Sequence, residues 1–418
     1  MKFTKMATLA LRNMGRNRRR SFLSALALGI TALSMVFVFS LLDGLFTDMK
    51  KNLIGFSTGH ISIRHSEYEK KKILQPLGYS VQNPFEFAQA LEAQPQILQA
   101  LPRIPFGAAV YLEEKNYSVF VLGLLPQKEE VLLKPSTYLS QGKLPRDGER
   151  EVVLGFALAQ ELGKGIGDKL EILARTRGRS SNMVTYTISG LANYPTADRN
   201  RSMILMPLDQ AQNLLRLTNA SLEILLVLQP EVAPSSYQAI AEDLNAQFAS
   251  NPTTESYKAQ AWNSPGLYTL ILEYGRMTYD FIALIIYLLG SVVVVNTTMM
   301  VIIERTREIG TLSALGLKGK ELVQLILLEA LGISIVGAGT GVILGSILTI
   351  IISLTGLDFS SAMAGVDFDL SPIWYPALSL QTVLVVFVSS VAVSGLASWL
   401  PARRAIKIHP AEALRSPT

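Results

Sequence analysis

Four apolar stretches of membrane length constrain this chain more than any other feature of its sequence. They occupy residues 21–48, 276–303, 321–356 and 378–402. About 20 helical residues cross the ~30 Å hydrocarbon core of a bilayer, so each stretch is long enough to span it with some tilt. The first is also too long for the apolar part of a signal peptide. The sequence therefore predicts an α-helical membrane protein with four transmembrane helices.

A large water-exposed domain accounts for the rest of the composition. The 418 residues are 49% hydrophobic and 17% charged, which is apolar for a soluble protein but too polar for one that lies wholly in lipid. Residues 49–275 contain no apolar run of membrane length. We expect them to form a large mixed α/β extracytoplasmic domain, inserted between helices 1 and 2, with enough residues for its own core.

Several segments of this domain have patterns clear enough to assign. Short runs rich in Val, Ile and Leu predict strands, and longer amphipathic runs predict helices. The predicted strands are Ile61–Ile63, Val119–Leu122, Val152–Leu154, Lys169–Leu173, Val184–Ile188, Met203–Met206 and Ile224–Leu228. The predicted helices are Phe85–Leu101, Leu208–Leu217 and Tyr237–Phe248.

The basic N-terminal segment orients the first span. Residues 1–20 contain seven Lys or Arg residues and no acidic residue, with apolar residues at helical spacing. This pattern predicts a cytoplasmic amphipathic basic helix on an anionic membrane surface, and it places the N-terminus in the cytoplasm. An arm that binds nucleic acid is the alternative, and the apolar run that follows argues against it.

The remaining connections agree with this orientation. The segment 304–320 and the tail 403–418 are rich in Lys and Arg, whereas residues 357–377 carry Asp but neither Lys nor Arg. Because basic loops stay on the cytoplasmic side, we expect both termini inside, a short outside loop at 357–377, and a multi-pass membrane protein. Pro401 is expected to end the fourth helix. The charges that carry this reading are Arg305, Arg307, Lys318, Lys320, Asp358, Asp367, Asp369, Arg403, Arg404, Lys407 and Arg415.

The segment 304–320 has a helical pattern of its own. Ile309, Leu312 and Leu315 recur every three residues, which predicts one apolar side of a short helix that lies against the membrane. Gly316 is placed to end this helix with a left-handed cap. An ordinary cytoplasmic loop is the alternative interpretation.

Opposite charges support the helical reading of the same segment. Glu304 and Arg307 are three residues apart, and so are Arg305 and Glu308. Pairs at this spacing favour a helix by a few tenths of a kcal/mol each.

Two polar residues interrupt the apolar spans. Asn296 lies in the second span, and Glu329 lies about two turns into the third. A polar group in lipid usually hydrogen-bonds to a neighbouring helix, so a packing role is favoured for Asn296 over a transport site. For Glu329 two readings stay open: a functional ionisable group, or a carboxylate that reaches the interface or pairs with a basic residue.

Small residues at a spacing of four predict close helix packing in the third and fourth spans. Residues four apart lie on one face of a helix, and small side chains there let another helix approach. The residues concerned are Gly337, Gly341, Gly345, Ser390, Ser394 and Ser398.

Catalytic, cofactor-binding and metal-binding residues are not expected in this chain. It has no Cys, which excludes a disulfide, a thiolate zinc site and a Cys nucleophile. Gly163, Gly165 and Gly167 fall in a turn but do not match the Walker pattern, so we expect them to be structural. His60 and His65 are five apart and would lie on opposite faces of a strand. No nucleophile–base constellation is recognisable.

Four stretches together resemble one known family. They are Leu9–Arg20 before the first span, Leu42–Leu45 with Thr58–Ile63 at the start of the inserted domain, Glu304–Gly310 with Ala314–Gly316, and Pro401–Ala405 with Pro410–Arg415. The chain resembles over its whole length the MacB/FtsX-type ABC transporter permeases, and within them the stand-alone, lipoprotein-releasing LolC/LolE kind. His409 departs from the family, which often has an acidic residue there.

The resemblance implies a mechanism called mechanotransmission. Closure of two cytoplasmic ATPase subunits moves a coupling helix, and the spans carry that motion to the outside domains. The residues implied for the ATPase-coupling helix are Glu304, Arg305, Thr306, Arg307, Glu308, Ile309, Gly310, Leu312, Ala314, Leu315 and Gly316. The resemblance also implies an outside domain of two subdomains.

The partners implied are LolD-like ABC ATPase subunits, a second permease subunit (a copy or a homologue), membrane lipid, and a periplasmic carrier or lipoprotein. The chain contains no Walker A sequence, so ATP and Mg are expected on a separate ATPase chain. The resemblance also implies a location in the bacterial inner membrane. Three functions are consistent with these residues: lipoprotein release or export of a related envelope substrate, an FtsX-like signalling permease that regulates a cell-wall hydrolase without transport, and a membrane-anchored enzyme, which the residues support least.

Overall fold

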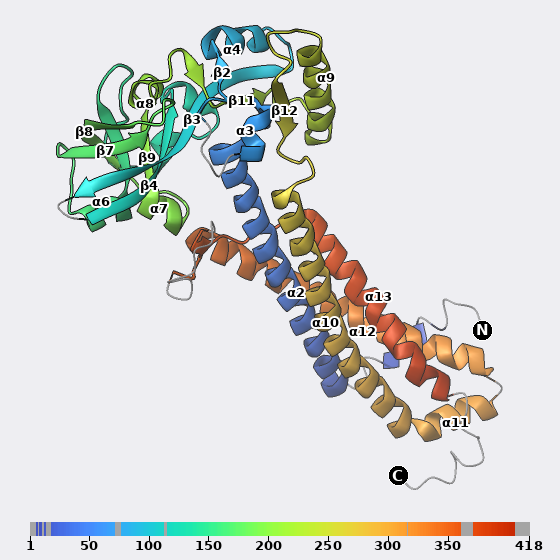
Figure 1. Cartoon of the computed structure of the whole chain (residues 1–418). Helices are drawn as coiled ribbons and strands as arrows, with labels where there is room; N and C mark the ends of the chain where they lie inside the picture. The colour runs from blue at the N-terminus through green and yellow to red at the C-terminus, as the bar shows by residue number, and fades with distance from the viewer. Residues whose placement is uncertain are drawn as a thin grey trace. The chain divides into compact units, whose positions relative to one another are not determined.

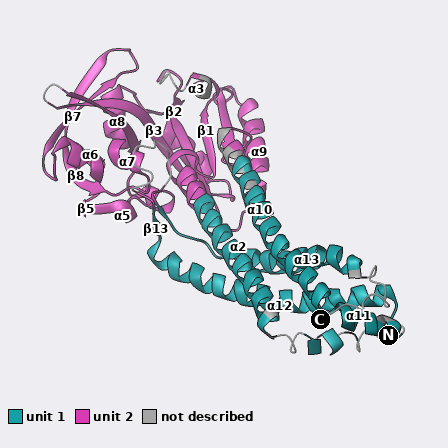
Figure 2. Cartoon of the chain, turned by 90° about the horizontal axis from the view of Figure 1, so that it is seen from below, with its two compact units in different colours: residues 1–47, 271–358, 373–418 teal, residues 48–270, 359–372 magenta. Residues whose placement is uncertain are grey.

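A computed structural model describes residues 6, 8–10, 12–13, 18–71, 77–112, 115–315, 317–360 and 371–405. The chain divides into two compact units (Figure 2). Unit 1 comprises residues 1–47, 271–358 and 373–418, and unit 2 comprises residues 48–270 and 359–372. Several residues singled out in the sequence lie outside the described residues, namely Gly316, Asp367, Asp369, Lys407, His409 and Arg415.

Unit 1 contains the four long apolar helices (Figure 1). They are α2 Arg18–Leu53, α10 Leu267–Glu304, α12 Gly319–Thr355 and α13 Leu380–Ala405. Each is long and apolar enough to cross a membrane, which confirms the four predicted spans. Because α2 has 36 residues and a helix rises 1.5 Å per residue, α2 is about 54 Å long and exceeds the hydrocarbon core. The helix α2 extends beyond residues 21–48 at both ends.

Pro401 does not end the fourth span, so that prediction is wrong. The helix α13 continues through Pro401 to Ala405. A proline removes one helical hydrogen bond, but membrane helices tolerate this where neighbouring groups satisfy the freed carbonyl. Pro401 is buried within unit 1. Near it, the Arg403 guanidinium lies 3.7 Å from the centre of the Trp399 ring.

Small and medium apolar side chains fill the core of unit 1. The α2 face that points inward is almost fully buried against α12 and α13. The buried cluster that this face forms with α12 and α13 comprises Ala32, Met35, Val36, Phe39, Ala338, Val342 and Val386. Two short strands, β13 Leu357–Asp358 and β14 Ile373–Trp374, pair in antiparallel fashion between α12 and α13. Of the predicted N-terminal helix, the described residues are helical, with Met6 and Ala10 buried.

Unit 2 is a mixed α/β domain built on one ten-stranded sheet. Its path runs β12–β1–β11–β3–β4–β9–β6–β8–β5, and β7 pairs with both β3 and β8. The strands are β1 Ile61–His65, β3 Ile97–Leu112, β4 Lys115–Leu124, β5 Leu139–Gly142, β6 Glu151–Gly155, β7 Lys169–Arg175, β8 Ser181–Ala192, β9 Met203–Pro207, β11 Glu223–Leu228 and β12 Tyr257–Ala261. A separate short pair joins β2 Val81–Gln82 to β10 Ala220–Ser221.

Short helices cover this sheet or cap its connections. They are η1 Ile54–Thr58, α3 Ser66–Lys71, α4 Pro84–Glu92, η3 Lys128–Val131, α5 Pro135–Tyr138, α6 Phe156–Leu162, α7 Ala197–Ser202, α8 Leu208–Leu215, η4 Pro234–Ser236 and α9 Tyr237–Ala249. The predicted α/β class, the seven predicted strands and the helices at α8 and α9 are confirmed. The expected glycine turn follows α6, with Gly163 at φ 62° and Gly167 at φ 92°.

The predicted helix Phe85–Leu101 is only half right. The helix α4 ends at Glu92, and β3 begins at Ile97. Pro95 lies between them and disfavours a helical conformation in the residue before it, so the helix cannot run through. The apolar residues after Pro95 belong instead to the longest strand of unit 2.

The two largest of the apolar cores of unit 2 lie along its sheet and meet at β3. One core packs α4 and α9 against β1, β11 and β12, and takes Ile97 and Ala100 from β3. The other packs α6 and α8 against β4 and β6–β9, and takes Ile104, Phe106 and Val110 from β3. A single continuous strand therefore serves both halves of the domain.

Candidate functional site

The charged segment after the second span folds into a short helix, α11 Thr306–Ala314. Arg305 alone forms the turn that separates α11 from α10. The Thr306 hydroxyl donates to the carbonyls of Ile302 at 3.0 Å and Ile303 at 2.7 Å, which holds the start of α11 on the end of α10. A hydroxyl at the first helical position thus bonds carbonyls that the ended helix leaves without partners.

One side of α11 is buried against the ends of the spans. Ile309 is 6% exposed and packs with apolar residues of α10, α12 and α13. Gly310 beside it is also buried. The other members of this cluster are Ile302, Leu322, Ile326 and Ala402. The cluster ties α11 to the other helices of unit 1, since it takes residues from three of them.

The predicted apolar side of Ile309, Leu312 and Leu315 is wrong in its last member. Leu312 is half-buried, but Leu315 is 77% exposed. A helix turns about 100° per residue, so a side chain six residues on lies about 120° around the axis. Leu315 also falls beyond the last residue of α11.

Arg305 connects α11 to the third span through an ion pair. Its Nη1 donates to both carboxylate oxygens of Glu329, at 3.1 Å and 2.9 Å, and its Nε donates to Glu308 Oε2 at 2.8 Å. The amide of Asn13 also donates to Glu329 Oε1. Burial alone lowers the pKa of Arg305, but the carboxylates of Glu329 and Glu308 outweigh it and raise that pKa, so the guanidinium stays charged.

Of the two readings left open for Glu329, the structure therefore shows the ion pair with a basic residue. Arg305 and Glu329 are 14% and 11% exposed at their side chains, so the pair is largely shielded from water. We call Arg305, Glu308, Glu329 and Asn13 the α11 junction. It joins the segment after α10, the helix α12 and the N-terminal segment of unit 1.

The opposite side of α11 faces away from the bundle. Its exposed residues are Arg307, Glu308, Thr311 and Ala314, which are polar or small. Glu304 before α11 and the apolar Leu315 after it are exposed too.

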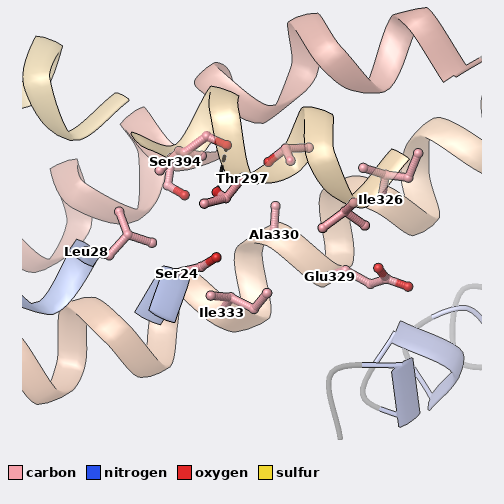
Figure 3. Close-up of a pocket in the computed structure, with 11 residues that line it drawn as sticks. Ser24, Leu28, Thr297, Ile326, Glu329, Ala330, Ile333 and Ser394 are labelled. Carbon is pink, nitrogen blue, oxygen red and sulfur yellow. Dashed lines mark hydrogen bonds between the residues drawn. The ribbon is translucent and has the colours of Figure 1, made fainter. Parts of the chain in front are cut away.

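A small cavity lies inside the four-helix bundle next to Glu329 (Figure 3). Its volume is about 40 Å³, which is room for a few water molecules. The residues that line it come from all four long helices and include Ser24, Thr297, Glu329 and Ser394. Ser394 is 1% exposed, and within the described part of the chain its hydroxyl has no hydrogen-bond partner. Hydroxyl groups thus lie among apolar side chains in the interior of the bundle.

The predicted glycine face of α12 packs directly on the backbone of α2. A Cβ on Gly337 would lie 2.5 Å from the carbonyl oxygen of Ala25, and a Cβ on Gly345 would lie 3.0 Å from that of Leu33. A Cβ on Gly341 would overlap the carbonyl oxygen of Gly29. At these glycines no side chain fits between the helices, so the backbone of α12 contacts that of α2 directly.

The predicted polar positions in the second and fourth spans differ in burial. Ser390 and Ser394 lie inside the bundle, at 5% and 1% exposure. Asn296 is exposed on α10, so a packing role for its amide requires a helix from outside this chain.

The α11 junction is a set of side-chain contacts between three segments of unit 1. Across the described residues, no group of three or more His, Asp or Glu residues could hold a metal ion. What the α11 junction does is link an exposed charged helix to the start of a spanning helix. Asn13 is the member that the sequence did not reveal, because nothing in its local pattern points to a carboxylate 316 residues away.

Two family models match the chain. The MacB-like periplasmic core domain matches residues 21–244, which is more than half of the chain, and the FtsX-like permease C-terminal domain matches residues 281–410. The first match covers α2 and most of unit 2. The second covers α11 and the spans on either side of it.

Three curated proteins illustrate the similarity. The lipoprotein-releasing system transmembrane protein LolC of Neisseria meningitidis serogroup B is 23% identical over 438 residues, covering 99% of each chain. LolC of Xylella fastidiosa is 24% identical over 332 residues, covering 75% of this chain and 78% of that protein. The macrolide export ATP-binding/permease protein MacB of Shigella boydii is 29% identical over 156 residues, covering 37% of this chain and 22% of that protein.

Proposed function

Because this chain belongs to the MacB/FtsX-type ABC transporter permeases, we propose that it is the permease subunit of a system that releases lipoproteins from the inner membrane, or exports a related envelope substrate, by mechanotransmission. The observation that carries the proposal is the α11 junction. An exposed charged helix is held to the start of a spanning helix by Arg305 and Glu329, at 2.9–3.1 Å. Force applied to α11 from outside the chain therefore acts directly on α12.

The proposal includes an orientation and a set of partners. Both termini and α11 lie in the cytoplasm, in line with the basic residues around them, and unit 2 lies in the periplasm. An ABC ATPase on a separate chain binds α11 and uses ATP and Mg, because the sequence here contains no Walker A pattern. A second permease subunit, a copy or a homologue, completes the transporter.

The substrate class rests on the relatives. LolC of Neisseria meningitidis, named for lipoprotein release, aligns along 99% of this chain, whereas MacB aligns along only 37%. A lipoprotein would be handled on the outer side of the membrane by unit 2 and passed to a periplasmic carrier. That route fits a chain in which the largest unit is not a spanning one.

Charge reversal on α11 tests the coupling. The variants Arg307→Glu and Glu308→Arg change the exposed face, and Gly310→Leu places a bulky side chain at a buried position. Coupling energies of ~1–3 kcal/mol correspond to ~5–150-fold effects, so we expect lipoprotein release per ATP hydrolysed to fall about tenfold or more. Membrane insertion should be unchanged. The measurement is release of a membrane-embedded lipoprotein from proteoliposomes that contain the chain and its ATPase.

Lys169→Glu is the matched control, since it reverses an exposed charge on β7, which belongs to the other unit. Wild-type coupling in all three α11 variants would show that α11 is only a connecting segment. ATP-independent release, or none, by the wild-type complex would overturn the transport proposal.

The match of residues 281–410 to the FtsX-like domain supports a second candidate, a signalling permease that regulates a cell-wall hydrolase without transport. It uses the same α11 contact with the ATPase. ATP-dependent stimulation of a hydrolase bound to unit 2, without lipoprotein release, would favour it.

A further inference from the structure

The end of the first long helix is held in unit 2 by an unusual set of buried charges. The helix α2 passes into a single π-helical segment, η1, and residues 48–58 of this run belong to unit 2. The N–H of Gly59 donates to the carbonyl of Ile54 at 2.9 Å and closes η1. The next carbonyls of a helix end have no partner within the helix and carry a partial negative charge. They are those of Gly55, Phe56 and Ser57.

Arg103 of β3 binds two of these carbonyls. Its Nη2 donates to the oxygen of Gly55 at 2.8 Å, and its Nη1 donates to that of Phe56 at 3.2 Å. The same guanidinium makes a two-point ion pair with Glu129 of η3, with both N–O distances at 2.6 Å. Both side chains are fully buried, at 0% exposure.

Arg64 of β1 binds the third carbonyl. Its Nη2 donates to the oxygen of Ser57 at 2.8 Å, and its guanidinium pairs with Glu223 of β11 at 2.6 Å. The side chains of Arg64 and Glu223 are 12% and 3% exposed. Two arginines from different strands thus bind three successive carbonyls at the end of one helix.

Strand register places these charges side by side. Arg64 lies opposite Glu223 in the β1–β11 pair, and Glu223 lies opposite Arg103 in the β11–β3 pair. The row therefore alternates in sign across three adjacent strands. We call Arg64, Arg103, Glu129 and Glu223 the arginine clamp.

The side chain of Phe56 is also held within unit 2. Its ring is 5% exposed and lies 5.7 Å from the Tyr138 ring and 6.1 Å from the Tyr194 ring, measured between centres. The guanidinium of Arg199 lies 4.1 Å from the centre of the same ring. The helix end therefore can neither rotate nor slide within unit 2 without breaking several buried contacts.

Stability alone does not account for buried charges of this kind. Replacing a buried ion pair by apolar side chains of similar size is often neutral or stabilising, because desolvation offsets the attraction between the charges. Apolar side chains, however, cannot bind backbone carbonyls. What the arginines add is a fixed position for the end of α2.

We infer that the arginine clamp is the joint through which movement of the first span is passed to unit 2. This inference rests on the proposed function, because it identifies where mechanotransmission enters the outside domain. Since α2 is continuous from Arg18 to Leu53, a displacement of the helix arrives at η1, and the clamp carries it into β1, β3 and β11. The four residues are positioning residues, because they hold the helix end and touch no substrate.

The first test measures the hold itself, by hydrogen exchange of the whole chain in detergent or nanodiscs. The variant R103M/E129M removes the charges, keeps similar volumes and should leave unit 2 folded. Loss of hydrogen bonds from a charged donor should speed exchange over residues 54–62 by about tenfold or more, with α9 unchanged. The control K143M/E151M removes a salt bridge of the same unit that does not contact η1, and should leave exchange at 54–62 unchanged.

The second arm of the clamp repeats the test independently. The variant R64M/E223M removes the donor to Ser57 and should act on the same segment. Unchanged exchange over residues 54–62 in both double variants overturns the inference.

The final experiment measures coupling in the complex with the ATPase in proteoliposomes. We expect R103M/E129M to hydrolyse ATP at the wild-type rate and to release lipoprotein about tenfold more slowly, whereas a merely structural role would leave the ratio of the two rates unchanged. Wild-type release by this variant overturns the role of the clamp and leaves the proposed function standing. If the wild-type complex itself releases nothing, the proposed function fails, and faster exchange over residues 54–62 in the variant would still show that the clamp holds the helix end.

Discussion

Glu329 brings a carboxylate two turns into a spanning helix, and its surroundings explain how the bundle tolerates it. The Arg305 guanidinium meets both of its oxygens, and Asn13 donates a further hydrogen bond. A carboxylate held in this way is satisfied by protein groups and does not face lipid. The same contacts make it sensitive to substitution, because a removed partner leaves a shielded charge behind.

We expect Glu329→Gln to destabilise unit 1 by about 2 kcal/mol, since it removes the ion pair and leaves Arg305 with Glu308 alone. Glu308→Gln is the matched control. The Glu308 side chain is 45% exposed, so its loss should cost less than about 1 kcal/mol. Thermal unfolding in one detergent checks both. Equal shifts for the two variants would contradict the assignment of Arg305 chiefly to Glu329.

Two histidines of unit 2 should make its stability depend on pH. Burial, with a smaller effect of Lys50, lowers the pKa of His60, and burial also lowers that of His65. A base with a lowered pKa binds a proton more readily when the chain is unfolded. Stability is therefore full above the ordinary histidine pKa of about 6.5 and falls as the pH drops below it.

The local geometry of His60 explains the direction. The N–H of Leu228 donates to its Nδ1 at 3.0 Å, so protonation there would set a donor against a donor. We expect the melting temperature of unit 2 to fall between pH 7.5 and pH 5.5. His60→Asn, whose side-chain oxygen can still accept, should flatten this dependence more than His65→Asn does. An unchanged profile in His60→Asn would rule His60 out as its source.

Sequence reasoning found single residues at this scale but not their partners. Arg305, Glu308 and Glu329 were each visible as charges beside or within apolar runs. The spacing predicted the pair of Arg305 with Glu308, which the structure confirms, but not the pair of Arg305 with Glu329, because that depends on how α11 turns back onto α12. The arginine clamp was missed entirely, because strand register decides that Arg64 and Arg103 meet Glu223.

At the scale of elements, the glycines of α12 contact the backbone of α2 directly. Gly341 faces Gly29 so closely that even a methyl group would overlap its carbonyl oxygen. Overpacking of this kind typically costs ~1–3 kcal/mol. We expect Gly341→Ala to lower the melting temperature of unit 1 and to leave that of unit 2 unchanged.

Gly339 of the same helix provides the control. A Cβ there would meet Phe387 at 3.8 Å, an ordinary contact, so Gly339→Ala should be neutral or stabilising by up to about 1 kcal/mol through helix propensity. Differential scanning calorimetry of both variants checks the pair. A stable Gly341→Ala protein would mean that the two helices pack less closely than this structure has them.

The element patterns also show where local sequence suffices and where it does not. The glycine spacing of four was readable because a helix repeats every 3.6 residues. The ends of helices were harder to predict. Pro95 separates α4 from β3, whereas Pro401 leaves α13 unbroken, and the difference lies in the surroundings of each proline rather than in its neighbours along the chain.

At the scale of the whole molecule, the chain combines two units with separate cores. Unit 1 is held by its long helices, and unit 2 by a ten-stranded sheet with helices on it. The division into a unit of long helices and an α/β unit was predictable. The sequence has four apolar runs of membrane length, and it has none between residues 49 and 275. The order of the strands was not, since the sheet joins segments that are distant along the chain.

The long strand β3 has a practical consequence for how the outside domain can be divided. Its first half packs in the apolar core under α4 and α9, and its second half packs in the core under α6 and α8. The two halves meet at Arg103 and Ile104. A gene fragment that ended there would leave each half with an unpaired sheet edge and a split core, and such edges invite aggregation. Fragments for expression, antibody generation or domain exchange between relatives should therefore keep residues 97–112 whole and carry both halves together.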